Sequence, residues 1–257
     1  MWSAAPQVQS ALPSHGRLTL RNGRATFLPM NTPSRVRKAV VVADAPAADL
    51  EPFRELLRDA DLVVAADGGA RYLLALDLLP HVAVGDFDSL AAEAVAGLVQ
   101  AGVEVLRHSV HKNETDLELA LLQAIERGAT CIHVLAALGG RPDQHLANLQ
   151  LLTHPRLASA DVRLVHRDWE MFAIRREAAI FGAPNDVVSL LPMTEAVTGI
   201  TTRGLYYPLR GETLRLGPAR GISNLLTHDH AQVTIESGIL LCMHQRRLLD
   251  PHSALPG

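Results

Sequence analysis

Residues 103–135 read VEVLRHSVHKNETDLELALLQAIERGATCIHVL, and this stretch decides the fold. Two short apolar runs, at 103–106 and 132–135, flank a helix-length segment at 115–127. Within that segment the apolar side chains recur three and four residues apart, which places them on one face of a helix. They are Leu117, Ala120, Leu121, Ala124 and Ile125. A buried run, an amphipathic helix and a second buried run are typical of a β-α-β unit, whose two strands run parallel.

The same alternation of strand and helix extends to both sides of this unit. It predicts further strands at 39–42, 62–66, 82–84 and 162–165, and further helices at about 50–59, 70–79, 90–101 and 143–153. Because the runs are almost continuously hydrophobic, we expect strands that are buried on both faces. The sequence therefore predicts an α/β fold with a doubly wound, mostly parallel sheet, whose ligands bind at the carboxyl ends of the strands.

The pattern changes after about residue 170, where short strand-like runs follow one another without a long helix. These runs lie at 187–191, 213–216, 232–235 and 239–242, separated by turns rich in glycine. They predict a second, smaller antiparallel β-sandwich domain. We expect an N-terminal extension over 1–37, an α/β catalytic domain over 38–170 and the β domain over 171–250. The extension is either disordered or contains a small hairpin around Asn22-Gly23.

The overall composition excludes several classes of protein. The 257 residues are 48% hydrophobic and 20% charged, with a net charge of −3, which is an ordinary balance for a globular enzyme. Neither nucleic acid nor a membrane is expected as a partner, because there is no basic excess and no run of about eighteen apolar residues. The two cysteines, Cys131 and Cys242, have no metal-binding spacing, and no signal peptide is evident. These features indicate a cytoplasmic protein.

Polar residues gather where the predicted strands end or where the helices begin. They form four loops, at 66–70, 85–89, 112–116 and 138–143. The carboxyl ends of parallel strands meet at one edge of a sheet, so we expect these loops to converge. Glycine pairs in two of the loops allow close approach of the backbone, whose N–H groups can then bind phosphate.

Asp86 and Asp88 follow a predicted strand directly, in the loop Gly85-Asp86-Phe87-Asp88-Ser89. Two carboxylates that are two residues apart in an extended backbone point to the same side. Such oxygen ligands, with open positions for water and phosphate, suit Mg²⁺. A turn with solvated charges is the alternative, and the pair alone does not decide between them. Convergence with Asp116 and with the phosphate-binding fork of Arg141 favours a site for Mg²⁺ and a nucleotide.

Other groups of residues are weaker candidates. The run His228-Asp229-His230 contains metal-binding side chains but lies among strand signals, so we expect a solvated loop. His133 and His145 are expected to be structural, and Ser89 lacks the Gly-x-Ser-x-Gly context of a nucleophile. The sequence contains no Walker A and no GxGxxG motif, so a nucleotide is held without the common phosphate loops.

Taken together, seven motifs resemble, in order and spacing, those of the thiamine pyrophosphokinase family. They lie at 66–70, at Pro80 with 85–89, and at 115–121, 139–148, 189–192, 204–209 and 222–224. The resemblance covers roughly residues 39–245. It implies an α/β catalytic domain and a β-sandwich domain that together transfer the diphosphate of ATP to the hydroxyl group of thiamine. The products are thiamine diphosphate and AMP, the cofactor is Mg²⁺ and the assembly is a homodimer.

The resemblance also implies roles for individual residues. The catalytic and metal-binding carboxylates are Asp86, Asp88 and Asp116. The residues that bind ATP are Thr115, Arg141, Asp143 and Asn148, and those that bind thiamine are Asp67, Tyr207, Ser223 and Asn224. The thiazolium cation of thiamine suits the aromatic face of Tyr207 and the carboxylate of Asp67. Either Asp116 or a neighbouring carboxylate is expected to accept the proton of the hydroxyl group.

The chain departs from the family pattern at four places. Asn113 stands where the family often has Asp, and Gln144 where it often has His. Tyr207 replaces a frequent Trp, and Asp44-Ala45-Pro46 replaces the usual Asn-Gly after the first strand. None of these changes removes a carboxylate of the expected Mg²⁺ set.

Three other functions are weighed against this one. A pyrophosphokinase for another alcohol, such as a hydroxymethylpterin, is disfavoured by Tyr207 and by Ser223-Asn224, which belong to a thiamine-type second domain. A non-catalytic regulator that binds nucleotide or thiamine would have no need of the complete acidic set. A metal-dependent phosphohydrolase would release phosphate or pyrophosphate without any acceptor.

Overall fold

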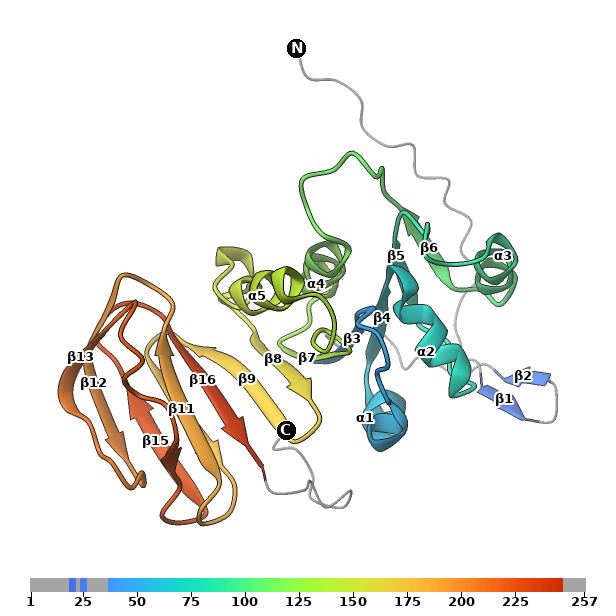
Figure 1. The fold of residues 1–257 in the computed structure, drawn as a ribbon. Helices are drawn as coiled ribbons and strands as arrows, with labels where there is room; N and C mark the ends of the chain where they lie inside the picture. Colours follow the sequence, from blue (N-terminus) through green and yellow to red (C-terminus); the bar gives the residue numbers. More distant parts are fainter. Residues whose placement is uncertain (1–18, 22–23, 27–36, 247–257) are drawn as a thin grey trace.

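The computed structural model describes residues 19–21, 24–26 and 37–246 (Figure 1). It contains a ten-stranded mixed sheet, a four-stranded antiparallel sheet and a two-stranded hairpin. Helices cover the parallel part of the large sheet, and a smaller antiparallel part follows it in the chain. The predicted fold class is therefore confirmed.

Six neighbouring strands of the large sheet run parallel. They are β3 (Lys38–Val42), β4 (Leu62–Ala66), β5 (Val82–Gly85), β6 (Glu104–Arg107), β7 (Cys131–Leu135) and β8 (Asp161–His166). Their order is β8-β7-β3-β4-β5-β6, so the chain builds outward from β3 to β6 and then returns to the other side of β3. The topological switch point lies between β3 and β7, where the crevice at the carboxyl ends is the expected ligand position.

Helices cover both faces of the parallel strands (Figure 1). On one face lie η1 (Glu51–Phe53), α1 (Arg54–Asp59), η2 (Asp67–Gly69), α2 (Ala70–Ala75) and α3 (Ala92–Gln100). On the other lie α4 (Asp116–Glu126), α5 (Pro142–Leu151) and η3 (Pro155–Leu157). Each face has its own core of buried aliphatic side chains. The predicted apolar face of α4 is confirmed, because its Leu and Ala members are buried and Ile125 packs against the same core.

The starts of α4 and α5 have residues that suit the N-terminus of a helix. Thr115 precedes α4, and its Oγ1 accepts a hydrogen bond of 3.2 Å from the backbone N–H of Glu118. This bond satisfies one of the N–H groups that a helix start leaves without an intrahelical partner. Pro142 is the first residue of α5, where its missing N–H costs nothing. The two helices begin within the polar loops 112–116 and 138–143.

The remaining strands form a sandwich at the end of the parallel region. The large sheet continues with β9 (Trp169–Ile174), β16 (Leu240–Gln245), β11 (Val187–Pro192) and β14 (Asn224–Leu225). The four-stranded sheet consists of β10 (Glu177–Phe181), β15 (His230–Thr234), β12 (Ala196–Arg203) and β13 (Arg210–Arg215). Side chains from both sheets, among them Phe172, Val188, Ile200 and Val233, form one buried core between them.

One sheet runs through the boundary predicted at 170–171. β9 pairs antiparallel with β8 on one side and with β16 on the other, so the hydrogen-bonded ladder has no break there. The division into 38–170 and 171–250 therefore stays a proposal about functional regions. Sequence patterns also missed β9, β10, β12 and β14, because two lie near the expected boundary, β12 contains Gly199 and β14 has only two residues.

Of the expected N-terminal extension, the structure describes two short strands. β1 (Thr19–Arg21) and β2 (Arg24–Thr26) pair antiparallel, with Leu20 opposite Ala25, so the hairpin alternative is found. The rest of the predicted extension up to residue 36 lies outside the described residues, as do 247–257. No helix in the described part of the chain is long and apolar enough to cross a membrane.

Two glycines provide a matched test of the packing at the carboxyl edge. A Cβ on Gly69 would lie 2.2 Å from the backbone oxygen of Val42, whereas a Cβ on Gly97 in α3 would meet nothing within 4 Å. We expect Gly69→Ala to destabilise the protein by about 1–3 kcal/mol through overpacking. Gly97→Ala should instead stabilise it by about 0.5–1 kcal/mol, because alanine loses less backbone entropy in a helix. Urea unfolding midpoints measure both changes, and a neutral Gly69→Ala variant would contradict the described close approach.

Candidate active site

Three carboxylates meet at the carboxyl edge of the parallel strands. Asp67 follows β4, Asp86 follows β5, and Asp116 opens α4, which packs against both strands. One carboxylate oxygen from each residue lies within 4.8 Å of the others. Within the described ranges no other group of three His, Cys, Asp or Glu side chains is close enough to share a metal ion. We call these three residues the acidic cluster.

Two turns with unusual backbone angles position the acidic cluster. Asp67 has a φ of 45° and Phe87 a φ of 61°, which is the left-handed region that non-glycine residues seldom adopt. Such residues concentrate at functional sites, where the surrounding structure holds them in place. The ring of Phe87 is buried, and the guanidinium of Arg107 lies 5.4 Å from its centroid. This anchor fixes the loop that carries Asp86 and Asp88.

Asp88, expected as a metal ligand, lies next to the acidic cluster rather than in it. Its backbone N–H donates a 3.1 Å hydrogen bond to Oδ1 of Asp86, and its side chain is exposed. The negative charge of Asp86 raises the pKa of Asp88, with smaller contributions from burial and from the charges of Asp67 and Asp116. The third carboxylate of the acidic cluster is thus Asp67 rather than the expected Asp88. The role expected for Asp88 stays a prediction.

The acidic cluster carries more negative charge than its neighbours neutralise. Nζ of Lys112 lies 2.5 Å from Oδ1 of Asp116 and 3.7 Å from Oδ2 of Asp86. Ser89 donates its hydroxyl hydrogen bond to Oδ2 of Asp67, while the buried Oδ1 of Asp67 has no hydrogen-bond partner. A buried oxygen without a partner and three adjacent carboxylates are costly unless a cation is bound. The donor set therefore fits a hard divalent cation that keeps open positions, as Mg²⁺ does.

The glycine pair that follows β4 packs against the end of β3. A Cβ on Gly68 would lie 2.4 Å from a carboxylate oxygen of Asp44, so only glycine leaves room for that side chain. Burial raises the pKa of Asp44, although the guanidinium of Arg71, 2.6 Å away, opposes the shift. Tyr72 donates a 2.5 Å hydrogen bond to the carbonyl of Ala45. Residues of α2 therefore hold the segment at which the chain departs from the family pattern.

The second glycine pair is engaged by a histidine. Nε2 of His145 accepts hydrogen bonds from the N–H groups of Gly139, at 2.7 Å, and Gly140, at 2.6 Å. These N–H groups were expected to bind phosphate. In this structure they donate to the imidazole of His145 instead. The structural role expected for His145 fits this geometry. A Cβ on Gly140 would lie 2.7 Å from Pro46, which shows how closely the loops after β3 and β7 pack at the switch point.

The residues expected to bind ATP lie at the start of α4, just before α5 or within α5. Arg141 and Asp143 are exposed and form a bidentate pair, with N···O distances of 2.6 and 3.1 Å. The bonds from Arg141 lower the pKa of Asp143 to about 2. The side-chain amide of Asn148 donates a 2.7 Å hydrogen bond to the carbonyl of Ala137, and Thr115 caps α4.

In the β-sandwich, the expected thiamine-binding residues differ in their surroundings. Tyr207 has an exposed ring, whereas Asn224 supports the loop that carries this ring. Tyr207 is 65% exposed and packs edge to face with Tyr206, with ring centroids 4.8 Å apart. Oδ1 of the buried Asn224 accepts hydrogen bonds from the N–H groups of Tyr207 and Leu225, both at 2.9 Å. Its amide donates to the carbonyl of Tyr207 at 2.7 Å. Asn224 therefore fixes the tyrosine loop, and the preceding residue, Ser223, donates its N–H to Oγ of Ser189 at 3.0 Å.

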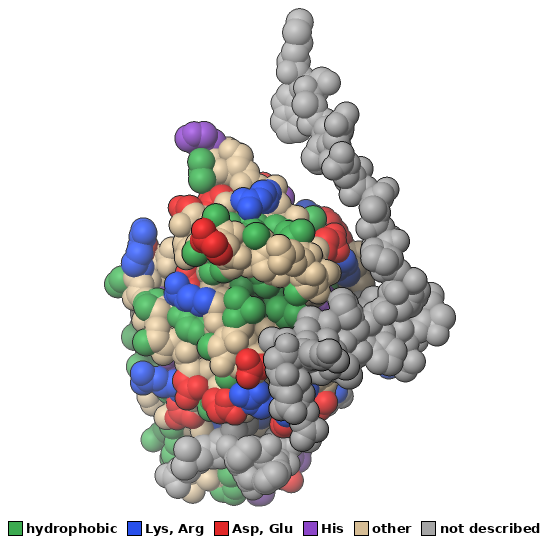
Figure 2. Space-filling view, turned by 90° about the vertical axis from the view of Figure 1, so that its right-hand side faces the viewer, with side chains coloured by type: hydrophobic (Ala, Val, Ile, Leu, Met, Phe, Trp, Pro, Cys, Tyr) green, Lys and Arg blue, Asp and Glu red, His purple; other side chains and the backbone are tan. Residues whose placement is uncertain are grey.

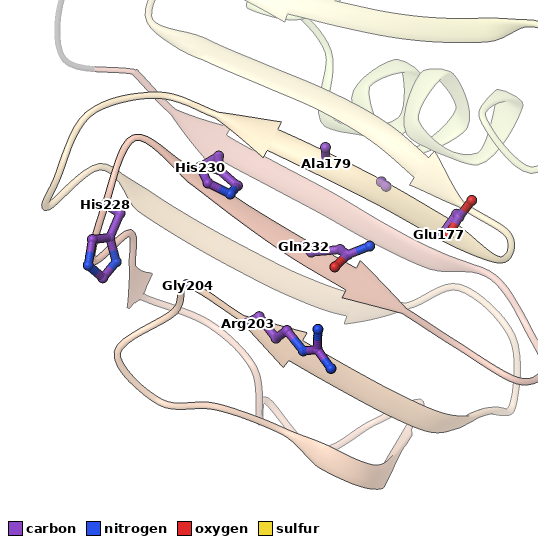
Figure 3. A pocket seen from close by; sticks show the side chains of 8 residues that line it. Glu177, Ala179, Arg203, Gly204, His228, His230 and Gln232 are labelled. Carbon is purple, nitrogen blue, oxygen red and sulfur yellow. The ribbon is translucent and has the colours of Figure 1, made fainter.

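A hollow of about 780 Å³ lies elsewhere, on the four-stranded sheet (Figure 3). Arg203 of β12 and His230 and Gln232 of β15 line it, together with Glu177 of β10. None of its lining residues belongs to the acidic cluster. In the run 228–230, His230 pairs with Asp229 at 2.7 Å and His228 bonds Thr227 at 2.9 Å, on exposed side chains. The side chains are exposed as expected, but only part of the run is a loop, because His230 is the first residue of β15.

One face of the molecule has a mixed distribution of charge. Figure 2 shows the face beside α3, on which acidic and basic side chains are interspersed and no continuous basic area is visible among the described residues. This mixture agrees with the net charge of −3.

The fold and the acidic cluster define a class of protein. Its members have an α/β domain with a cluster of carboxylates at the carboxyl edge of the sheet, followed by a β-sandwich. Two family models match this chain in the same order. Residues 53–165 match the thiamin pyrophosphokinase catalytic domain, and residues 173–240 match the thiamin pyrophosphokinase vitamin B1 binding domain. The chain belongs to the thiamine pyrophosphokinase family, which confirms the resemblance seen in its sequence motifs.

Individual relatives support the same assignment. The thiamine pyrophosphokinase of Bacillus subtilis (strain 168) is 28% identical over 203 residues, which cover 78% of this chain and 95% of that protein. The crystal structure of the Bacillus subtilis protein matches with a TM-score of 0.74 at 27% identity, and covers 82% of this chain and 100% of its own. That of a thiamin pyrophosphokinase from Geobacillus thermodenitrificans matches with a TM-score of 0.71 at 30% identity, over 85% of this chain and 100% of its own.

The position of Asp67 generates a test of the acidic cluster. We expect Asp67→Asn to weaken Mn²⁺ binding by at least about tenfold, because the site loses one charged oxygen ligand. Asparagine tolerates the left-handed backbone of residue 67, so the turn should persist. Asp88→Asn should weaken binding much less, and Asp61→Asn, at the opposite edge of the sheet, should leave it unchanged. Electron paramagnetic resonance titration with Mn²⁺ measures all three, and a larger loss in Asp88→Asn than in Asp67→Asn would contradict the geometry.

Proposed function

We propose that this protein is a thiamine diphosphokinase, which transfers a diphosphate group from ATP to the hydroxyl oxygen of thiamine. The observation that carries the proposal is the acidic cluster of Asp67, Asp86 and Asp116, within a chain that matches both domains of the family. The reaction forms a bond between the thiamine oxygen and the β-phosphorus. It breaks the bond from the β-phosphorus to the oxygen that bridges to the α-phosphorus, and AMP leaves.

Charge neutralisation is the main task of such a site, because the hydroxyl oxygen gains negative charge as it attacks a highly negative triphosphate and AMP leaves as an anion. The acidic cluster would hold Mg²⁺, which when bound supplies positive charge to the phosphate oxygens. The guanidinium of Arg141 offers a planar fork of donors to the same oxygens. Arg141 is 72% exposed in its pair with Asp143, so its side chain is accessible to a ligand.

Thiamine has a permanent positive charge and needs a different environment. The exposed ring of Tyr207 provides an aromatic face for the thiazolium, and Asn224 holds the loop that carries it. The hydroxyl proton passes either to Asp116 of the acidic cluster or to the neighbouring Asp88. These residues lie on two regions of the chain, and we propose that a homodimer brings them together at each site. Two adjacent tyrosines exposed by more than half suit such an interface.

The environment of the cysteines supports a cytoplasmic location. Cys242 is fully buried and Cys131 is partly exposed, and both are free thiols. Burial raises the pKa of the Cys131 thiol, which keeps it in the less reactive protonated form. Unpaired cysteines are usual where the compartment is reducing.

An assay of products tests the proposed function. With ATP, Mg²⁺ and thiamine, the protein should form thiamine diphosphate and AMP in equal amounts, which chromatography resolves. Consumption of ATP at the same rate without thiamine would indicate a phosphohydrolase. Diphosphorylation of a hydroxymethylpterin but not of thiamine would assign another acceptor, and binding without turnover would indicate a regulator. Each of these three outcomes contradicts the proposal.

The acidic cluster should be required for that turnover. We expect Asp86→Asn to lower kcat by at least about a hundredfold, because a correctly held cation contributes several kcal/mol to charge neutralisation. Asp61 serves as the control, since it accepts hydrogen bonds of 3.0 Å from two backbone N–H groups far from the acidic cluster. Asp61→Asn should retain normal kcat. If Asp86→Asn were as active as Asp61→Asn, the metal role of the cluster would be wrong.

A further inference from the structure

Lys112 occupies an unusual position beside the acidic cluster. It precedes α4, and its side chain is only 13% exposed. Its Nζ lies 2.5 Å from Asp116 and 3.7 Å from Asp86, so one ammonium contacts two of the three carboxylates. The chain has just one other lysine, Lys38, which is exposed at the start of β3. An ammonium inside this site is therefore not part of a general lysine-rich surface.

Lys112 neutralises only part of the negative charge of the acidic cluster. The buried Oδ1 of Asp67 has no hydrogen-bond partner, and the ammonium of Lys112 pairs with Asp86 and Asp116 but not with Asp67. One positive charge also cannot neutralise three carboxylates. A divalent ion would satisfy all three, but it must compete with Lys112 for the oxygens of Asp86 and Asp116.

We propose that Lys112 is a built-in counter-ion that the divalent cation displaces, and that its freed ammonium then binds the phosphates of ATP. This inference rests on the proposed function. The lysine side chain suits both positions, because its charge sits at the end of a flexible four-carbon stem. Rotation about that stem moves the ammonium between neighbouring anions without moving the backbone. Lys112 is a positioning residue for the metal ligands and a binding residue for the nucleotide.

The exchange couples metal binding to nucleotide binding. Without ATP, the cation must remove an ammonium from its carboxylates, and that ammonium gains no phosphate in return. With ATP present, the displaced ammonium gains phosphate oxygens, so the same displacement becomes easier. Each ligand therefore raises the affinity for the other, and by thermodynamic linkage the two factors are equal. The site would then load the cation mainly together with its nucleotide.

Removal of the ammonium tests the competition. In the absence of nucleotide, Lys112→Met should bind Mn²⁺ about tenfold more tightly than the wild type, within the usual range of coupling between sites. Lys112→Arg, which keeps the charge, should bind Mn²⁺ like the wild type, and so should Lys38→Met. Electron paramagnetic resonance titration gives the dissociation constants. Unchanged or weaker Mn²⁺ binding in Lys112→Met would overturn the proposal, as would Lys112→Arg binding as tightly as Lys112→Met.

The same Mn²⁺ titration with ATP present tests the coupling. ATP should raise the Mn²⁺ affinity of the wild type more than that of Lys112→Met, whose KM for ATP should also rise. Equal enhancement in the two proteins would show that the ammonium does not bind the phosphates, and would overturn that half of the proposal.

A measurement on the unsubstituted protein avoids any effect of mutation on folding. Mass spectrometry can follow the acetylation of the two lysines by acetic anhydride. Mg²⁺ alone should speed the reaction of Lys112, because the ammonium leaves its carboxylates, and addition of ATP should slow it again. The reaction of Lys38 should not change. If Mg²⁺ does not change the acetylation rate of Lys112, the proposed displacement is wrong.

These outcomes separate the inference from the function on which it rests. If the wild type makes thiamine diphosphate but Mn²⁺ binding is insensitive to Lys112→Met, the inference alone fails. If Asp86→Asn leaves wild-type Mn²⁺ binding intact, the metal role of the acidic cluster is wrong and the inference fails with it.

Discussion

β4 and β5 run side by side in the same direction, so the residues that follow them must emerge at one edge. That constraint forces Asp67 and Asp86 together, and α4 adds Asp116 because it packs against the same two strands. Like charges held this close repel, and the backbone cannot move them apart without breaking parallel pairing. The left-handed turn at Asp67, the buried ring of Phe87 and the hydroxyl of Ser89 all hold the acidic cluster in place. The repulsion that remains is what makes this edge attractive to a cation.

The polar groups at this edge are bonded to one another rather than exposed to solvent alone. Lys112 contacts the carboxylates, His145 accepts from the glycine N–H groups, and Arg141 pairs with Asp143. Each of these contacts includes a protein group that resembles part of a ligand. Lys112 supplies a cation, as a metal would. His145 supplies a hydrogen-bond acceptor and Asp143 a negative charge, as a phosphate would. Binding of a metal nucleotide would therefore exchange internal bonds for bonds to the ligand. Net affinity then depends on the difference between the two sets of bonds, which is smaller than either set.

Much of the fold follows from local sequence, whereas the site depends on contacts that no local pattern contains. The parallel strands and α4 were predictable because continuous apolar runs and a helical period reflect burial. β12 was not, since Gly199 interrupts its pattern and its pairing with β13 and β15 decides its structure. Asp67 and Asp88 both carry carboxylates near strand ends, and only the three-dimensional turn shows which one joins the acidic cluster. The engagement of Asn224 with the Tyr207 backbone was likewise hidden, because the partners are seventeen residues apart.

The unbroken ladder from β8 through β9 to β16 has a mechanical consequence. In many two-domain enzymes a flexible linker lets the domains close over the substrates like a hinge. Here the connection is a row of backbone hydrogen bonds, and bending it would shear several of them at once. The β-sandwich and the parallel region should therefore move as one rigid unit. Closure over bound substrates then has to come from loops such as 108–115.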